Sequence, residues 1–153
     1  MKKIKVYTDG SCLGNPGEGG WGAIIQYTDK ENIQEKILRG GENHTTNNRM
    51  EMTGVIAALA WIEKHLISKN EKNTYLIEIF SDSRLIIETM TKNWKKKMNT
   101  DLWAQMEEAI ENLMTEKVTI SWNWVKGHAT DKLNQRVDKI AVAESTKQKK
   151  ELR

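Results

Sequence analysis

Apolar and polar residues alternate along the N-terminal part of the chain, and this pattern predicts three β-strands. The alternation runs through residues 4–9, 21–27 and about 33–41, and a period of two residues is typical of strands that bury one face. The segment 10–20 contains five glycines and the only proline, Pro16, which indicates a turn between the first two strands. We therefore expect these strands to form an antiparallel meander.

From Asn48 onward the apolar period lengthens to that of an α-helix. One stripe recurs at helical spacing and comprises Met52, Val55, Ile56, Leu59, Ile62 and Leu66. Three further helices are predicted at about residues 83–93, 101–115 and 131–145. The short apolar runs 75–80 and 118–125 are predicted to be strands.

The order of these elements predicts an α/β fold. After a meander and a helix, the strand at 75–80 most simply lies parallel to the first strand. We expect a five-stranded mixed sheet, with three antiparallel strands followed by parallel strands, flanked by about four helices. No internal repeat or low-complexity segment interrupts the pattern.

Length and composition favour one domain. The chain has 153 residues, of which 38% are apolar, so it can bury one core, and we expect a single domain at 1–146 with a basic, disordered tail at 147–153. Cys12 is the only cysteine, which excludes an internal disulfide and a cysteine-based zinc site. No apolar run approaches the ~20 residues of a membrane span, and the N-terminus lacks a signal-peptide core. We expect a cytoplasmic monomer with no membrane association and no obligatory protein partner.

The lysines are unevenly distributed, although the net charge is only +3. One cluster comprises Lys92, Lys95, Lys96 and Lys97, and another lies within 147–153. Basic clusters attract phosphodiesters and make binding salt-dependent. Lysines at helix ends and chain termini also serve simply as solvated surface, so both interpretations stay open for the two clusters.

Four carboxylates occur in four separate predicted elements: Asp9, Glu51, Asp82 and Asp138. Asp9 and Asp82 end two strands that are predicted to be neighbours, so their backbones would lie ~4.8 Å apart. Glu51 and Asp138 flank the inward faces of two helices. Because clustered negative charges repel one another unless divalent cations lie between them, the quartet predicts a metal-dependent nuclease.

Each carboxylate also has a purely structural explanation. Asn48 and Glu51 have the spacing of a capping box at a helix N-terminus. Asp9 precedes a glycine and Asp82 precedes a serine, as turn and cap residues commonly do. The functional interpretation therefore depends on the four residues together.

The chain resembles type 1 ribonuclease H, a family that cleaves the RNA strand of RNA·DNA hybrids. The motifs that carry the resemblance span nearly the whole chain and are YTDGSCLGNPGEGGWGAII, TTNNRMEMTGVIAAL, SDSRLI and WVKGHATDKLNQRVDKIA. The resemblance implies the ribonuclease H-like fold, with the four carboxylates as catalytic metal ligands. It further implies that His128, in the KGHA segment, assists proton transfer or product release.

The chemistry of this family implies two divalent cations, Mg²⁺ or alternatively Mn²⁺, bound by oxygen ligands. Such a pair activates a water molecule and stabilises the leaving 3′ oxygen. The products would carry 5′-phosphate and 3′-hydroxyl ends.

The resemblance also implies residues that contact the hybrid, which is recognised largely through its minor groove. The groove would be contacted by Gly10, Cys12, Asn15, Asn47 and Asn48, and a phosphate of the DNA strand by Thr46 and Asn99. Arg84 stands where the family commonly has glutamine, so it would contact either the groove or a phosphate.

The segment between the two middle helices departs from the family. Many bacterial members carry an extra basic helix and loop there, whereas only residues 93–97 bridge the helices here. The DNA strand is therefore expected to be held either more weakly or by Lys95, Lys96 and Lys97 alone. No separate hybrid-binding domain is expected before Met1.

Three other interpretations compete with a stand-alone hybrid endonuclease. A resolvase or transposase of the same fold would also use clustered carboxylates, but lacks the TNNRME and KGHA contexts. A non-catalytic hybrid-binding module should have lost an acidic residue, and all four are present. A fragment of a retroviral reverse transcriptase is disfavoured because the chain starts with its own Met1.

Overall fold

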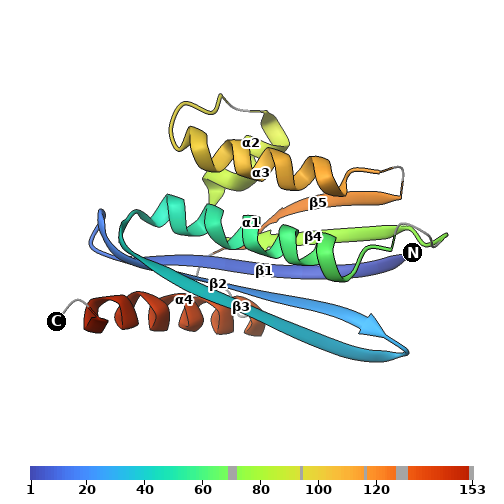
Figure 1. The fold of residues 1–153 in the computed structure, drawn as a ribbon, viewed down its shortest axis with the longest axis horizontal. Helices are drawn as coiled ribbons and strands as arrows, with labels where there is room; N and C mark the ends of the chain where they lie inside the picture. The colour runs from blue at the N-terminus through green and yellow to red at the C-terminus, as the bar shows by residue number, and fades with distance from the viewer. Residues whose placement is uncertain (69–71, 94, 116, 127–130, 152–153) are drawn as a thin grey trace.

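A five-stranded mixed sheet forms the centre of the computed structural model, which describes residues 1–68, 72–93, 95–115, 117–126 and 131–151. The elements follow one another as β1 (Lys2–Leu13), β2 (Gly17–Asp29), β3 (Asn32–Thr45), α1 (Asn47–His65), β4 (Tyr75–Ser81), α2 (Arg84–Lys92), α3 (Thr100–Leu113), β5 (Val118–Trp124) and α4 (Lys132–Glu151). Figure 1 shows α1, α2 and α3 on one side of the sheet and α4 on the other. The predicted order of strands and helices is confirmed.

The sheet has the predicted mixed topology. Its strands lie in the order β3-β2-β1-β4-β5, with antiparallel pairing of β1 with β2 and of β2 with β3. The pairs β1·β4 and β4·β5 are parallel. Thr8 pairs with Ser81 in this register, so Asp9 and Asp82 follow at matching ends of two adjacent strands.

Two glycines of the segment 10–20 allow helices to pack directly against strands. The prediction of a turn over this whole segment is wrong, because the turn comprises only residues 14–16 and both strands extend toward it. A Cβ at Gly10 would lie 2.5 Å from the backbone nitrogen of Glu51, and one at Gly20 would clash with the backbone of Ala141 and Ser145. These glycines therefore set the distance of α1 and α4 from the sheet.

The larger apolar core lies between the sheet and α1. Four residues of the predicted helical stripe, Met52, Val55, Leu59 and Ile62, have no exposed surface, and the other two lie at the edge of the cluster. Burying such side chains stabilises the fold by roughly 1.5–3 kcal/mol each. This packing holds the first turns of α1 against β1.

On the other face of the sheet, α4 packs against a smaller cluster formed by Tyr7, Ile24 and Val137. The helix extends to Glu151, so residues 147–151 are helical rather than disordered. No glycine or proline follows Ser145 to end the helix where it was predicted to end. The domain boundary at 146 stays a prediction.

Ion pairs join α4 to the edge strand β3. Arg39 Nε lies 2.6 Å from Glu144 Oε1. Arg136 donates two hydrogen bonds to Glu35, of 2.9 and 3.0 Å, and these bonds lower the pKa of Glu35 to about 2. The helix is thus tied to the sheet along its exposed side as well as through its apolar side.

Within the part of the chain that the structure describes, none of the helices combines the length and the apolar character needed to cross a bilayer.

Replacement of Gly20 by alanine should lower the free energy of unfolding by about 1–3 kcal/mol, because the added methyl group would press against the backbone of α4. Chemical denaturation measures the change. Ser11→Ala provides the control. Ser11 pairs with Gly20 across β1 and β2, and its replacement adds no atom and removes only a 3.4 Å contact with Ser145. Equal stability of the Gly20→Ala variant and the unsubstituted protein would contradict the close packing described here.

Candidate active site

Three of the four predicted catalytic carboxylates converge at one point of the structure. Asp9 comes from β1, Glu51 from α1 and Asp82 directly follows β4. One oxygen from each lies within 4.8 Å of an oxygen of the other two. Residues that are widely separated in sequence thus form a single acidic cluster.

Local structure explains why Glu51 faces this cluster. Thr46 caps α1, with its hydroxyl accepting a hydrogen bond from Arg49 N at 3.3 Å. The helix therefore begins before Asn48, and a capping box at Asn48 and Glu51 is not formed. Glu51 lies further along the helix, is only 9% exposed, and approaches β1 at Gly10.

Asp82 and Asp9 are likewise not used as caps. Ser83 is the N-cap of α2 and accepts a hydrogen bond from Ile86 N at 3.3 Å. Asp9 lies within β1, and its Oδ1 accepts a hydrogen bond from the adjacent Gly10 N at 2.9 Å. Neither residue therefore caps a helix, and both side chains are available to the cluster.

Burial, with a contribution from nearby negative charge, raises the pKa of the three carboxyls. Burial, followed by the negative charge of Asp82, raises the pKa of Asp9 to about 8. Burial also raises the pKa of Glu51, to which the charges of Asp9 and Asp82 contribute. The pKa of Asp82 is raised chiefly by burial. An ionised cluster is therefore unfavourable unless a cation compensates it.

The donor set fits a hard divalent cation. Glu51 Oε2 is buried and has no hydrogen-bond partner among the described residues, and a buried carboxylate oxygen in that condition is costly. All the available ligand atoms are carboxylate oxygens, which suit Mg²⁺ and Mn²⁺. The cluster therefore has both the space and the chemistry to bind such an ion.

Asp138 faces the same cluster from the other side of the sheet, although it does not belong to the close group of three. It lies on α4 and is exposed. A hydrogen bond with Asp138 raises the pKa of Asp9, and the negative charge of Asp138 raises that of Asp82. Asp138 is thus near enough to affect Asp9 and Asp82, but it lies outside the group of three.

His128, the predicted proton-transfer residue, lies outside the described residues.

The predicted minor-groove residues gather where the β1–β2 turn meets the start of α1. Asn15 Oδ1 accepts a hydrogen bond from Asn47 N at 3.2 Å. Cys12 Sγ donates to Thr45 O at 3.4 Å. Gly10 lies against α1 beside the carboxylates, and Asn48 lies in the first turn of that helix. These residues form the polar rim of the site, which lies around the start of α1 beside the carboxylates.

The predicted phosphate pocket contains an arginine that the sequence analysis did not identify. Arg49 Nη1 donates to Asn99 Oδ1 at 3.3 Å, and two further bonds, of 2.9 and 2.7 Å, join Arg49 to Asp101. Thr46 is adjacent through its cap bond to Arg49 N. In the sequence, the signal that could have identified Arg49 was its position between Asn47-Asn48 and Glu51.

Arg84 lies beside the cluster together with a tryptophan that was also missed. Its guanidinium is 5.5 Å from the centre of the Trp124 ring and donates to Glu88 at 2.8 Å. Trp124 Nε1 donates to the backbone oxygen of Asp82 at 3.2 Å. The end of β5 thus supports the strand end that carries Asp82.

The three consecutive lysines of the shortened segment have different surroundings. Lys96 forms an ion pair of 2.8 Å with Glu107 and lies 5.8 Å from the centre of the Trp103 ring. Lys95 and Lys97 are exposed. Lys96 is therefore engaged with α3, whereas its two neighbours extend into solvent.

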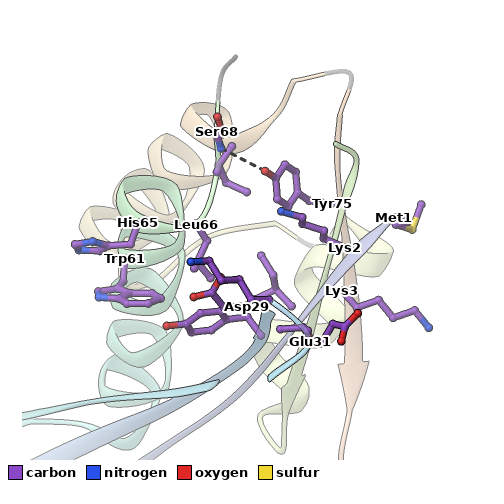
Figure 2. A pocket seen from close by; sticks show the side chains of 15 residues that line it. Met1, Lys2, Lys3, Asp29, Glu31, Trp61, His65, Leu66, Ser68 and Tyr75 are labelled. Carbon is purple, nitrogen blue, oxygen red and sulfur yellow. Dashed lines mark hydrogen bonds between the residues drawn. The ribbon is translucent and has the colours of Figure 1, made fainter. Parts of the chain in front are cut away.

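A cavity of about 1010 Å³ lies at the opposite end of the sheet from the carboxylates. Figure 2 shows its lining, which includes Lys2 and Lys3 at the start of β1, Trp61 and His65 near the end of α1, and Tyr75 of β4. None of the predicted site residues lines it. This cavity therefore lies apart from the predicted site.

Comparison with known proteins places the chain in a family. A family model described as RNase H matches residues 1–146. The chain belongs to the ribonuclease H family. It is 41% identical to Ribonuclease H of Maricaulis maris, covering 92% of each chain, and 38% identical to that of Alcanivorax borkumensis, covering 92% of this chain and 90% of the relative. It is therefore a hydrolase of the endoribonuclease class.

Solved structures agree with this assignment. LC11-RNase H1, solved in complex with an RNA/DNA hybrid, is 27% identical with a TM-score of 0.71, covering 94% of this chain and 97% of that one. LC9-RNase H1, described as a type 1 RNase H with the type 2 active-site motif, is 29% identical with a TM-score of 0.72, covering 97% and 74%. The N-terminal RNase H domain of a Mycobacterium tuberculosis protein shares the fold, with a TM-score of 0.79 at 24% identity and full coverage of both chains.

The raised carboxyl pKa values predict how the stability of the metal-free protein varies with pH. A folded-state pKa of about 8 for Asp9, against about 3.9 in the unfolded chain, contributes stability that is complete below about pH 4 and is lost as the pH rises to about 8. Thermal melts in EDTA should therefore show a falling melting temperature across this range.

The Asp9→Asn variant removes this titration, so its melting temperature should fall less between pH 5 and pH 8 than that of the unsubstituted protein. Asp29→Asn makes the same chemical change beside the distant cavity and should leave the pH dependence unaltered. Identical pH profiles for Asp9→Asn and the unsubstituted protein would contradict the raised pKa.

Proposed function

We propose that this ribonuclease H hydrolyses the RNA strand of RNA·DNA hybrids with two divalent cations, leaving 5′-phosphate and 3′-hydroxyl ends. Mg²⁺ is the proposed cofactor, and Mn²⁺ is an alternative. The observation that carries the proposal is the convergence of Asp9, Glu51 and Asp82 within 4.8 Å around a buried carboxylate oxygen that lacks a partner. Family membership and the hybrid complex of LC11-RNase H1 support the choice of substrate.

The carboxylates hold the cations in this proposal. Asp9 and Glu51 provide buried oxygens, Asp82 provides half-buried ones, and Asp138 contributes from α4. Once bound, the cations would supply an activated water and neutralise charge on the leaving oxygen. The protein fixes the ligands on rigid strands and helices, which lowers the cost of ordering them during the reaction.

The polar rim next to the cluster is proposed to hold the hybrid. Gly10, Cys12, Asn15, Asn47 and Asn48 would lie along the minor groove, where RNA and DNA differ in their 2′-hydroxyls. Thr46 and Asn99 would bind a phosphate of the DNA strand, and the bond from Arg49 to Asn99 Oδ1 orients that amide. Arg84, exposed over Trp124, would contact a phosphate or the groove near Asp82.

His128 is proposed to assist proton transfer or release of the cleaved strand, since an imidazole changes its protonation near neutral pH. The enzyme is further proposed to act in the cytoplasm as a monomer, without an obligatory protein partner.

Asp9→Asn should lower the rate of hybrid cleavage by about two orders of magnitude or more, because it removes a negatively charged ligand of the cations that the reaction needs. The measurement uses a labelled RNA·DNA duplex with Mg²⁺, alongside double-stranded RNA and double-stranded DNA. Only the RNA strand of the hybrid should be cut, and the Asp29→Asn control should retain full activity. Cleavage of either control duplex at a similar rate would refute the proposed specificity.

The exposed lysines of the shortened segment should make binding sensitive to salt. A Lys95/Lys97→Ala double variant should raise KM for the hybrid and reduce the slope of log KM against log salt concentration by about 2, one for each lost phosphate contact. Lys96→Ala is the matched control, because Lys96 is paired with Glu107 and its loss should leave the slope nearly unchanged. An unaltered slope in the double variant would exclude these lysines from the interface.

A further inference from the structure

A long-range hydrogen bond joins β1 to the beginning of α4 beside the carboxylate cluster. Tyr7, two residues before Asp9, is buried, and its hydroxyl donates to Asp131 Oδ2 at 2.9 Å. The two residues are 124 positions apart in the chain. The bond therefore connects the strand that carries Asp9 to the helix that carries Asp138.

Asp131 uses its other carboxylate oxygen to begin α4. Asp131 Oδ1 accepts hydrogen bonds from the backbone nitrogens of Leu133 and Asn134, at 2.9 and 3.4 Å, which is the arrangement of an N-cap. A single side chain thus binds the first turn of α4 with one oxygen and β1 with the other. The position of the helix start is consequently tied to the Tyr7 hydroxyl.

Helical geometry links this bond to the fourth carboxylate. Asp131 and Asp138 are seven residues apart, which at 3.6 residues per turn places them on nearly the same face of α4. Tyr7 and Asp9 are two residues apart and lie on the same face of β1. The strand and the helix are therefore linked at two successive positions, by the Tyr7–Asp131 hydrogen bond and by the interaction of Asp138 with Asp9.

The two pairs have opposite electrostatic character. A hydroxyl donating to a carboxylate attracts, whereas Asp9 and Asp138 repel one another when both are ionised. Between the two pairs, Val137 packs against Tyr7 in the apolar cluster of this face. The Tyr7–Asp131 bond is thus placed to oppose the movement of α4 away from β1 that the second pair favours.

The tyrosine ring is held independently of its hydroxyl. It stacks on Phe80 of β4 with the ring centres 4.7 Å apart and the planes inclined by 12°. Because stacking and burial do not require the hydroxyl, Tyr7→Phe removes the bond to Asp131 and leaves the ring in place.

We propose that Tyr7 is a positioning residue for the metal site, which through Asp131 keeps Asp138 directed at Asp9 and Asp82. This inference rests on the proposed function, in which Asp138 contributes to cation binding. Loss of the hydroxyl should let the first turns of α4 move and should weaken cation binding, while the polar rim that contacts the hybrid is unaffected.

The test measures Mn²⁺ binding by calorimetry without substrate, together with hydrogen exchange of the α4 amides. Tyr7→Phe should bind Mn²⁺ about tenfold more weakly, the scale found for residues that orient metal ligands, and the first amides of α4 should exchange faster. In cleavage assays the metal concentration for half-maximal activity should rise, whereas KM for the hybrid at saturating metal should not change.

Two variants of Asp131 separate positioning from general stability. Asp131→Asn keeps one side-chain oxygen for the cap and adds an amide nitrogen that can donate a hydrogen bond to the Tyr7 hydroxyl oxygen. The Mn²⁺ affinity of this variant should therefore stay near that of the unsubstituted protein. Asp131→Ala should match Tyr7→Phe or exceed it. Glu35→Gln is the control, because it weakens the bond of Arg136 to β3 and so loosens α4 at a different place.

Unchanged Mn²⁺ affinity in Tyr7→Phe would overturn the proposal, as would an equal loss of affinity in Glu35→Gln. These outcomes are distinct from failure of the proposed function. If the unsubstituted chain binds Mn²⁺ but cuts no hybrid, the proposed function fails and the binding comparison still decides the role of Tyr7. If the unsubstituted chain binds no Mn²⁺, both proposals fail.

Discussion

Repulsion among buried carboxylates is the constraint on which the arrangement of this protein depends. Oxygens of Asp9, Glu51 and Asp82 lie within 4.8 Å of one another. Burial is the largest cause that raises the pKa of each, and the negative charge of a neighbouring carboxylate adds to it in every case. Such a cluster lowers the stability of the metal-free fold near neutral pH, and the packing of the rest of the molecule must compensate. The same free energy becomes available for binding when a cation enters.

The scaffold meets this constraint by bringing rigid elements to the cluster from both faces of the sheet. Parallel pairing of β1 with β4 places two carboxylates at adjacent strand ends. Gly10 lets α1 approach closely enough to add Glu51, and the buried stripe of that helix holds it there. From the opposite face, α4 brings Asp138 and is fixed by Val137 and by Tyr7. The packing that holds these elements in place is made by other residues, so the carboxylates are available to bind ions.

Much of this arrangement was predictable because it follows from periodicity. Alternation defined the strands, the apolar stripe defined α1, and the rule for parallel strands brought Asp9 beside Asp82. Less predictable were contacts that depend on exact distances in three dimensions. Glycines in the segment 10–20 signal a turn by type, yet Gly10 and Gly20 lie in strands because helices pack on them. Arg49, Tyr7 and Trp124 act through partners distant in sequence, and no local pattern identifies such partners.

The contacts of the three consecutive lysines were likewise not predictable from the sequence. Their sequence gives no reason to distinguish Lys95, Lys96 and Lys97, whereas in the structure Lys96 forms an ion pair with Glu107 and its two neighbours are exposed. Likewise, the end of α4 depends on contacts as well as on residue type, since Gln148 packs beside Gly41 of β3.

The ion pairs between α4 and β3 also bear on how the molecule behaves at high concentration. An outermost strand presents unpaired backbone groups that can recruit a strand from another molecule, and charged side chains along such an edge discourage this. Most of β3 is exposed, but Glu35 and Arg39 carry charge along it and are bridged to Arg136 and Glu144 of α4. The side chains that form ion pairs between β3 and α4 therefore also discourage intermolecular β-pairing at this edge of the sheet.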